Sequence, residues 1–306
     1  MIRRGNHLAL VGATASGKSA LAMEVARRDP TVELVSVDSM AVYRGMDIGT
    51  AKPTPAERAE VAHHLLDLAD PGEDFSVARF QVAARVAIAA IEARGHRALL
   101  VGGTGLYLRA VVDDLDLPGQ YPDTRASVEA EPDTVALHQR LSGLDPVAAG
   151  RMEPTNRRRV VRALEVTTGS GRPFSSFGPG LGAYPPVPIA QVGLRLPAEV
   201  LDARIEDRFA AMLDAGFLDE VLGLASRPGG ISRTARQALG YKELLAHVAG
   251  ELSLDQAIEA AVARSRRFAR RQLRWLRRDP RIAWQDVSDN PLALVDDLLG
   301  DWVPCT

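Results

Sequence analysis

The sequence has few of the features that would assign it directly to a class of protein. Its one cysteine, Cys305, excludes a framework of internal disulfide bonds and fits a reducing compartment. No apolar stretch approaches bilayer length, and the formal net charge of -2 points to no membrane or nucleic-acid partner for the chain as a whole. The only lysines are Lys18, Lys52 and Lys242, so arginine carries most of the positive charge. We therefore expect a cytoplasmic protein whose partners are indicated by local clusters.

The chain does contain enough apolar sequence for a sizeable core. It has 306 residues, of which 46% are hydrophobic and 25% charged, as in a globular protein with one large domain or two modest ones. An apolar run over residues 8–11 predicts a buried strand, and residues 19–28 show helical periodicity. The turn between them, GATASGKS, has the spacing of a phosphate-binding loop, or P-loop.

The P-loop carries the residue types that a diphosphate needs. Gly12 and Gly17 allow backbone angles closed to other residues, so successive amides can point at phosphate oxygens near the positive end of a helix. We expect Lys18 to reach the outer phosphates and Ser19 to ligate Mg²⁺. The expected binding residues are Gly12, Ala13, Thr14, Ala15, Ser16, Gly17, Lys18 and Ser19.

Further strands alternate with helices along the chain. Residues 32–38, 97–103 and 188–196 predict buried strands, and Ser76 is expected to cap a helix that ends near Arg94. This alternation predicts an α/β fold with a doubly wound parallel sheet, whose ligands bind outside the carboxyl ends of the strands. The expected parts are a P-loop core (1–116), an inserted all-helical subdomain (117–187) and a second part of the core with Arg-rich C-terminal helices (188–306), one of them spanning about residues 254–278.

Polar side chains at the predicted strand ends and in one loop are candidates for the chemistry. Asp38 could hold magnesium through water or accept a proton as general base; alternatively, it caps its own turn. Gly102 and Gly103 are expected to let a planar group approach closely, and Thr104 to contact the substrate, unless it is only a helix N-cap. Lys52 is either a second diphosphate clamp or a solvated surface charge.

Two arginine clusters suit a polyanion. Arg158, Arg159 and Arg162 share one side of a predicted helix, with Val161 turned toward packing. In the long C-terminal helix a stripe at helical spacing consists of Arg264, Arg267, Arg271, Arg274 and Arg278. Such a stripe is typical of nucleic-acid binding, and the alternative is a solvated Arg-rich surface.

Seven sequence blocks then occur in an order that resembles the tRNA dimethylallyltransferases. They are GATASGKS, DSMAVYRGMDIGTAKP, HHLLD, VGGTGLYLRA, RRVVRALEV, RQALGYKE and RRFARRQLRWLRR. The resemblance covers nearly the whole chain, from Gly12 to about Trp284. It implies that the bound diphosphate is that of dimethylallyl diphosphate, and that the five-carbon group passes to N6 of adenosine 37, which follows the anticodon.

The resemblance also implies roles for individual residues. Lys18, Asp38 and Thr104 would be catalytic, with Asp38 accepting a proton from the adenine amine. The implied tRNA-binding residues are Asp38, Ser39, Met40, Ala41, Thr104, Arg125, Arg158, Arg159, Val160, Val161, Arg162, Arg267, Arg271 and Arg274. The target base would leave its stack, and the helical insert would grip the anticodon stem-loop. Mg²⁺ is the implied cofactor, and we expect a monomer.

Three positions differ from the family pattern. Ala41 stands where many members have Gln, Ala13 where Pro is common, and Arg158 where Gln is frequent, so base contacts at Ala41 and Arg158 are altered. Other functions remain open at this point: a small-molecule kinase, prenyl transfer to a free adenine nucleotide, or a nucleotide-dependent RNA-binding module without catalysis. The helical insert and the Arg stripe favour tRNA over these three.

Overall fold

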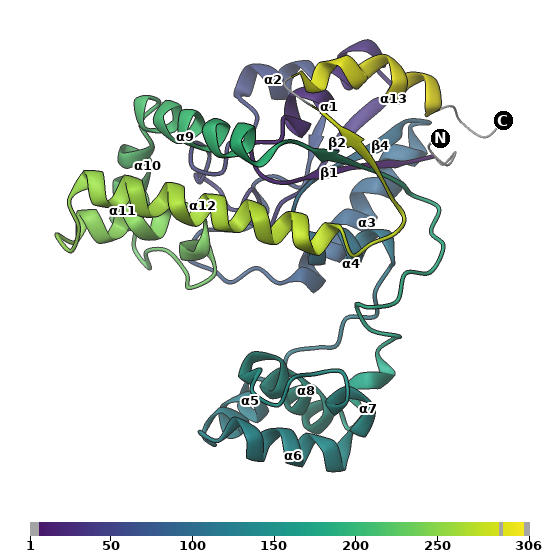
Figure 1. The fold of residues 1–306 in the computed structure, drawn as a ribbon, viewed down its shortest axis with the longest axis vertical. Coiled ribbons are helices and arrows are strands. Elements are labelled where there is room, and N and C mark those ends of the chain that lie inside the picture. Colours follow the sequence, from purple (N-terminus) through teal and green to yellow (C-terminus); the bar gives the residue numbers. More distant parts are fainter. Residues whose placement is uncertain (1–5, 288–289, 303–306) are drawn as a thin grey trace. The chain divides into compact units, whose positions relative to one another are not determined.

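The computed structural model describes residues 6–287 and 290–302, so Cys305 lies outside the described residues. Two compact units divide the chain: residues 1–113 with 186–306 form the first, and residues 114–185 form the second (Figure 1). The sequence placed the insert at 117–187. No helix among the described residues is long and apolar enough to cross a membrane.

The first unit contains a six-stranded sheet in which every strand pair is parallel. The strands are β1 (Leu8–Gly12), β2 (Val32–Val37), β3 (His63–His64), β4 (Arg97–Gly102), β5 (Ala190–Arg195) and β6 (Ile282–Asp286), in the spatial order β3-β2-β4-β1-β5-β6. The sequence predicted β1, β2, β4 and β5 but neither β3 nor β6. Both missed strands lie at sheet edges, where polar residues interrupt the continuous apolar run of a buried strand.

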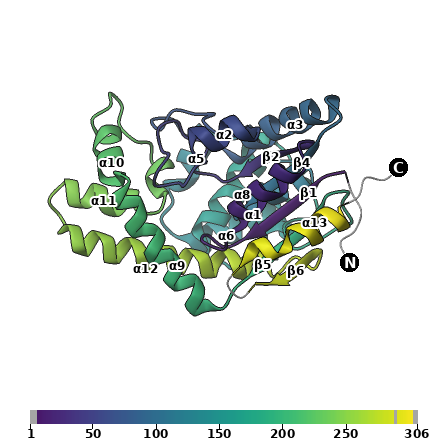
Figure 2. The ribbon, with the colours of Figure 1, turned by 90° about the horizontal axis from the view of Figure 1, so that it is seen from above.

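Helices cover both faces of this sheet (Figure 2). The helices of this unit are α1 (Lys18–Arg28), α2 (Pro55–Glu60), α3 (Val77–Ala93), α4 (Gly105–Val112), α9 (Ala198–Asp214), α10 (Phe217–Ala225), α11 (Tyr241–Val248), α12 (Leu254–Leu276) and α13 (Val295–Asp301), with short 3₁₀ turns η2 (Ala235–Gln237) and η3 (Pro291–Leu294). Side chains of β1 alternate between the two cores: Leu8 and Leu10 pack with α1 and α13, whereas Ala9 and Val11 join the larger core that includes α3, α4 and α12. The doubly wound α/β fold predicted from the sequence is therefore correct.

Capping side chains fix where several of these helices begin. The Ser76 hydroxyl accepts a hydrogen bond from the backbone N–H of Arg79, so α3 begins where the sequence predicts. Ser253 and Gln256 form a capping box at the start of α12. The long C-terminal helix thus begins at Leu254 as predicted, and it ends at Leu276, two residues earlier than expected.

The second unit is helical throughout its regular structure. It contains α5 (Pro122–Glu129), α6 (Thr134–Leu144), α7 (Pro146–Ala149), α8 (Arg157–Ser170) and the 3₁₀ turn η1 (Phe174–Ser176). Its own core gathers Val128, Leu137, Leu141, Val160 and Leu164 with their neighbours. A separate core of this kind gives residues 114–185 a packing centre that does not depend on the sheet.

Candidate active site at the carboxyl edge of the sheet

The loops that follow β1, β2 and β4 start at the same level of the sheet. Val11 and Val37 both pair with Gly102, so Gly12, Asp38 and Gly103 each stand one step beyond that row. Thr104 follows, and its Oγ1 accepts a hydrogen bond from the backbone N–H of Ser39 at 3.4 Å. The predicted meeting of the P-loop, Asp38 and Thr104 at one edge is confirmed.

The P-loop has the backbone geometry of a phosphate cradle, although its two glycines serve different purposes. Gly17 has φ +86° and Ala15 has φ +62°, which turn the backbone before α1 begins. Gly12 has no such angle; a Cβ there would lie 2.8 Å from Ser16 Oγ. Gly12 is therefore needed for space and not for the backbone angle that the sequence suggested.

The cationic end of Lys18 is held inside the loop. Its Nζ donates to the carbonyl of Ala13 at 3.0 Å. Burial and, to a smaller extent, the nearby guanidinium of Arg208 lower the pKa of Lys18 to about 8, against the opposing effect of the Asp38 carboxylate. The ammonium therefore lacks an anionic partner strong enough to restore its ordinary pKa, which is the situation that a bound diphosphate would correct.

Arg208, on α9, is a second cation at this edge that the sequence did not reveal. Its Nη1 donates to Thr14 Oγ1 at 3.4 Å, and burial lowers its pKa while Asp38 partly offsets that effect. Two cations beside one carboxylate give the edge a positive potential suited to an anion. No local motif surrounds Arg208 in the sequence, so nothing in the pattern marked it.

Asp38 both caps its turn and presents a carboxylate. Its Oδ1 accepts from the backbone N–H groups of Met40 at 2.7 Å and Ala41 at 3.3 Å, which is the capping alternative noted from the sequence. Among the described residues no hydrogen bond to Oδ2 is found. The turn thus fixes one oxygen and leaves the other without a partner among the described residues, so the predicted role as general base stays a prediction.

The two glycines at the end of β4 have a packing role that the sequence did not reveal. A Cβ at Gly102 would lie 2.1 Å from the carbonyl oxygen of Val37, and one at Gly103 would lie 2.4 Å from Nε2 of Gln272. Packing within the protein therefore already requires both glycines, and the approach of a planar group stays a prediction. Thr104 occupies the N-cap position of α4, but its hydroxyl makes no capping hydrogen bond and meets Ser39 instead.

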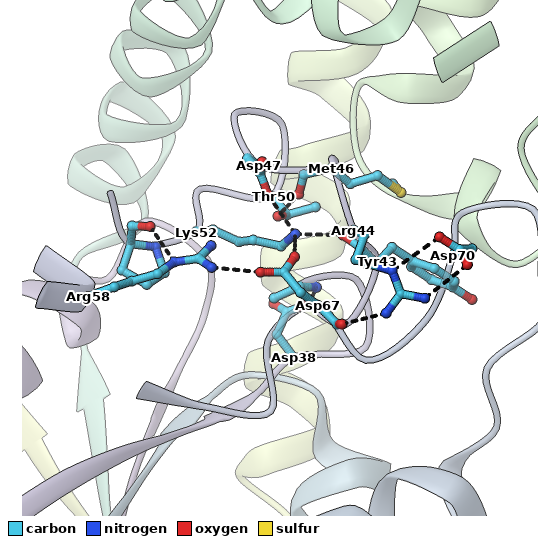
Figure 3. Close-up of polar contacts among 12 residues, drawn as sticks. Asp38, Tyr43, Arg44, Met46, Asp47, Thr50, Lys52, Arg58, Asp67 and Asp70 are labelled. Carbon is cyan, nitrogen blue, oxygen red and sulfur yellow. Dashed lines mark hydrogen bonds and ion pairs between the residues drawn. The ribbon is translucent and has the colours of Figure 1, made fainter. Parts of the chain in front are cut away.

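Lys52 is neither a diphosphate clamp nor a surface charge (Figure 3). Its side chain is 1% exposed, and Nζ donates to the carbonyl of Tyr43 at 2.5 Å, to Asp47 at 2.7 Å and to Asp67 at 2.6 Å. Arg58 holds the second oxygen of Asp67. The ammonium thus fastens the loop that follows Asp38, a role that depends on partners the sequence does not place.

A magnesium ion would find little protein ligation here. Ser19 is exposed at the first turn of α1, and the described residues contain no group of three or more His, Cys, Asp or Glu that could hold a metal. Such a site fits Mg²⁺ that is bound mainly by phosphate oxygens and water, as is common for this ion. The donor set is compatible with the predicted role of Ser19 and does not test it.

In the second unit the predicted tRNA-binding residues separate into three groups. Arg158 and Arg159 are exposed on α8. Arg125 and Arg162 both form ion pairs with the buried carboxylate of Glu165. Val160 and Val161 are 0% and 2% exposed and belong to the core of the unit, so their side chains cannot contact an RNA.

Other predicted contacts are also limited by burial. Ala41 is 4% exposed, so only its backbone is available in this conformation, whereas Ser39 and Met40 are half-buried. In the P-loop, Ala13 and Ser16 are almost fully buried, and the Ser16 hydroxyl has no hydrogen-bond partner among the described residues. Ala13 and Ser16 thus offer a diphosphate little side-chain surface, and the Ser16 N–H already donates to the carbonyl of Ala13 at 3.3 Å.

The arginines of α12 divide into those that pair with a carboxylate of the protein and those that are exposed. Arg264 pairs with Glu243, Arg266 with Glu206, and Arg270 with Asp202. Arg267, Arg271 and Arg274 are exposed on α12, with the Arg271 guanidinium 5.7 Å from the centre of the Phe268 ring; Arg278 is also exposed but lies beyond the end of the helix. The predicted stripe is thus exposed on the helix at Arg267, Arg271 and Arg274, whereas Arg264 is used in an ion pair inside the protein and Arg278 follows the end of the helix.

Comparison with known proteins identifies the family. Residues 41–279 match the family model described as IPP transferase. A tRNA dimethylallyltransferase of Kineococcus radiotolerans is 47% identical, with 95% of each chain covered. The solved tRNA isopentenylpyrophosphate transferase of Bacillus halodurans is 39% identical, covers 96% of both chains and has a TM-score of 0.69. A eukaryotic dimethylallyltransferase acting on tRNA is 25% identical over 98% of this chain and 81% of that one, with a TM-score of 0.78. The chain therefore belongs to the IPP transferase family.

Proposed function

We propose that this protein transfers the dimethylallyl group of dimethylallyl diphosphate to N6 of the adenosine at tRNA position 37 and releases diphosphate. The observation that carries the proposal is the meeting of the P-loop, Asp38 and Thr104 at one sheet edge, beside the cations Lys18 and Arg208. The relatives, which are tRNA dimethylallyltransferases, favour prenyl transfer over a kinase or a non-catalytic module. Monomeric state and cytoplasmic location stay predictions.

Binding of the donor follows from the P-loop. Amides of Ala15 and of residues 17–19 surround the diphosphate, and Lys18 turns from the Ala13 carbonyl to a phosphate oxygen. Arg208 supplies the second cation. As the allylic carbon–oxygen bond breaks, negative charge develops on the leaving diphosphate, and these fixed positive groups stabilise it. Mg²⁺, with Ser19 as its protein ligand, would share that charge.

The acceptor is activated at Asp38. Nitrogen N6 of the adenine forms the new bond to the allylic carbon, and Oδ2 of Asp38 takes the proton that N6 loses. Because two backbone amides hold Oδ1, the carboxylate needs little reorganisation to face the base. Thr104, whose hydroxyl already meets the Ser39 amide, is placed to bind the incoming nucleotide.

The tRNA would be bound mostly through charge. Exposed arginines on α12 and on α8 offer contacts to phosphate groups of the anticodon stem-loop, and each such contact adds salt-sensitive affinity. Extrusion of adenosine 37 from its stack is required, because N6 must reach Asp38. Contacts of Ala41 and Arg158 with tRNA bases stay predictions, since both positions differ from the family pattern.

The test compares acceptors directly. The protein, Mg²⁺ and dimethylallyl diphosphate with a radiolabelled prenyl group are mixed with an unmodified anticodon stem-loop, with the same stem-loop carrying G at position 37, or with AMP. Label on the A37 stem-loop alone is expected. Label on AMP would move the acceptor to free nucleotide, and ATP consumption with a small alcohol in place of any labelling would replace the proposal with a kinase.

A further inference from the structure

Gln272 lies on the buried side of α12 and uses both ends of its side-chain amide. Its Oε1 accepts a hydrogen bond from the backbone N–H of Thr14 at 2.8 Å, and its Nε2 donates to the carbonyl of Gly103 at 3.0 Å. The residue is 8% exposed, on a stripe otherwise formed by small or apolar residues: Ala257, Ala261, Ser265, Ala269 and Leu276. A glutamine in that stripe needs partners, and it finds both of them in the active-site loops.

The two partners belong to different halves of the proposed reaction. Thr14 is part of the P-loop, which holds the prenyl donor. Gly103 directly precedes Thr104, whose hydroxyl accepts from Ser39 in the loop that begins at Asp38. The fit at the second contact is close, because a Cβ on Gly103 would come within 2.4 Å of Nε2. A single side chain of α12 therefore links the P-loop to the loop that follows β4.

The first contact also changes what the P-loop can offer a ligand. The backbone N–H of Thr14 is already used by Gln272, so the diphosphate is left to the amides that follow it. Gln272 thus acts on the position of the loop and not on the ligand itself. Removing it would leave the phosphate-binding groups present but free to shift against Thr104.

We propose that Gln272 is a positioning residue that fixes the distance and angle between the allylic carbon of the donor and N6 of the adenine. The proposal rests on the prenyl-transfer function proposed above. Bond formation requires the two reacting atoms to be aligned at close range, and a displacement of about 1 Å costs up to about 10²-fold in rate. The loss is expected in the chemical step, because the groups that bind each substrate separately remain.

The first test replaces Gln272 with methionine, which has a similar length and makes neither hydrogen bond. The kcat of Gln272→Met with the A37 stem-loop should fall by about 10-fold to 10²-fold, with the KM for each substrate changed by less than about threefold. The matched control is Gln191→Met, because Gln191 is also a buried glutamine of the first unit, and neither of its amide atoms has a hydrogen-bond partner among the described residues. This control should keep the wild-type kcat.

A second variant keeps the test informative if methionine unfolds the protein. Gln272→Glu retains the size and the acceptor for the Thr14 N–H, but at about pH 8 its ionised carboxylate cannot donate to Gly103. Its kcat should also fall while both KM values hold. Full activity of either variant, or a rise in KM with unchanged kcat, would overturn the proposal. Absence of labelling by the wild-type enzyme would instead refute the proposed function, and this inference with it.

Discussion

The charge of Lys18 makes donor binding depend on pH in a range where most lysines do not titrate. Burial and the neighbouring Arg208 lower the pKa of Lys18 to about 8 in the free protein, against the opposing effect of Asp38. Only the protonated form offers a cation to the diphosphate. Deprotonation occurs as the pH rises through this pKa, so affinity for dimethylallyl diphosphate should fall between pH 7 and pH 9.

The size of the effect follows from the fraction of charged Lys18. With a pKa of about 8, that fraction is about 0.9 at pH 7 and about 0.09 at pH 9. If only the charged form binds, the apparent dissociation constant rises about 10-fold over this range. The ligand contributes little to the change, because the last phosphate proton leaves near pH 6.

Isothermal titration calorimetry with dimethylallyl diphosphate and Mg²⁺ at pH 7, 8 and 9 measures this change. Repeating the titration at pH 8 in two buffers of different ionisation enthalpy counts the proton taken up, which should be about 0.5 per ligand because half of the Lys18 is neutral there. The control is Lys18→Arg, whose guanidinium stays charged, so its affinity should not change with pH. A wild-type dissociation constant that is the same at pH 7 and pH 9 would refute the argument.

Three further predictions concern the base, the arginine surface and the buried lysine. Asp38→Asn, which can still accept the turn hydrogen bonds, should lower turnover by about 10² to 10⁴ while stem-loop affinity stays within about threefold. Undiminished turnover would rule out Asp38 as the general base. Replacing Arg267, Arg271 and Arg274 with Ala should weaken stem-loop binding and reduce the slope of the logarithm of the binding constant against the logarithm of the salt concentration by about 2 to 3. An unchanged slope would show that these side chains do not contact the RNA. Lys52→Met should lower the free energy of unfolding by about 2 to 3 kcal/mol, since Asp47 and Asp67 lose their buried partner; an unshifted urea midpoint would contradict this.

The central strands were predictable because a buried parallel strand reads as a continuous apolar run. This holds for β1 and β4, each of which pairs with a strand on either side and packs into cores on the two faces of the sheet. It fails at the edges, where β3 consists only of His63–His64 and β6 contains Gln285 and Asp286. Edge strands need fewer apolar residues, so their pattern does not differ from that of a loop.

The sequence predicted those site residues that come directly after a strand. Asp38 and Thr104 each stand within two residues of a strand, so sheet topology alone brings them to the P-loop. Arg208 and Gln272 come from α9 and α12, far along the chain, and no rule of sequence spacing relates them to residue 14. Their contribution depends on how helices pack, which a single sequence does not encode locally.

The spatial order of the strands has a consequence for how this protein is made. β1 lies between β4 and β5, but β5 and β6 follow residues 114–185 in the chain. During synthesis β1 therefore remains an open edge until the whole insert has left the ribosome, and exposed strand edges invite mispairing. The insert, with its own core, can fold during that interval. Completion of the sheet then becomes a late, long-range step that chaperones would be expected to protect.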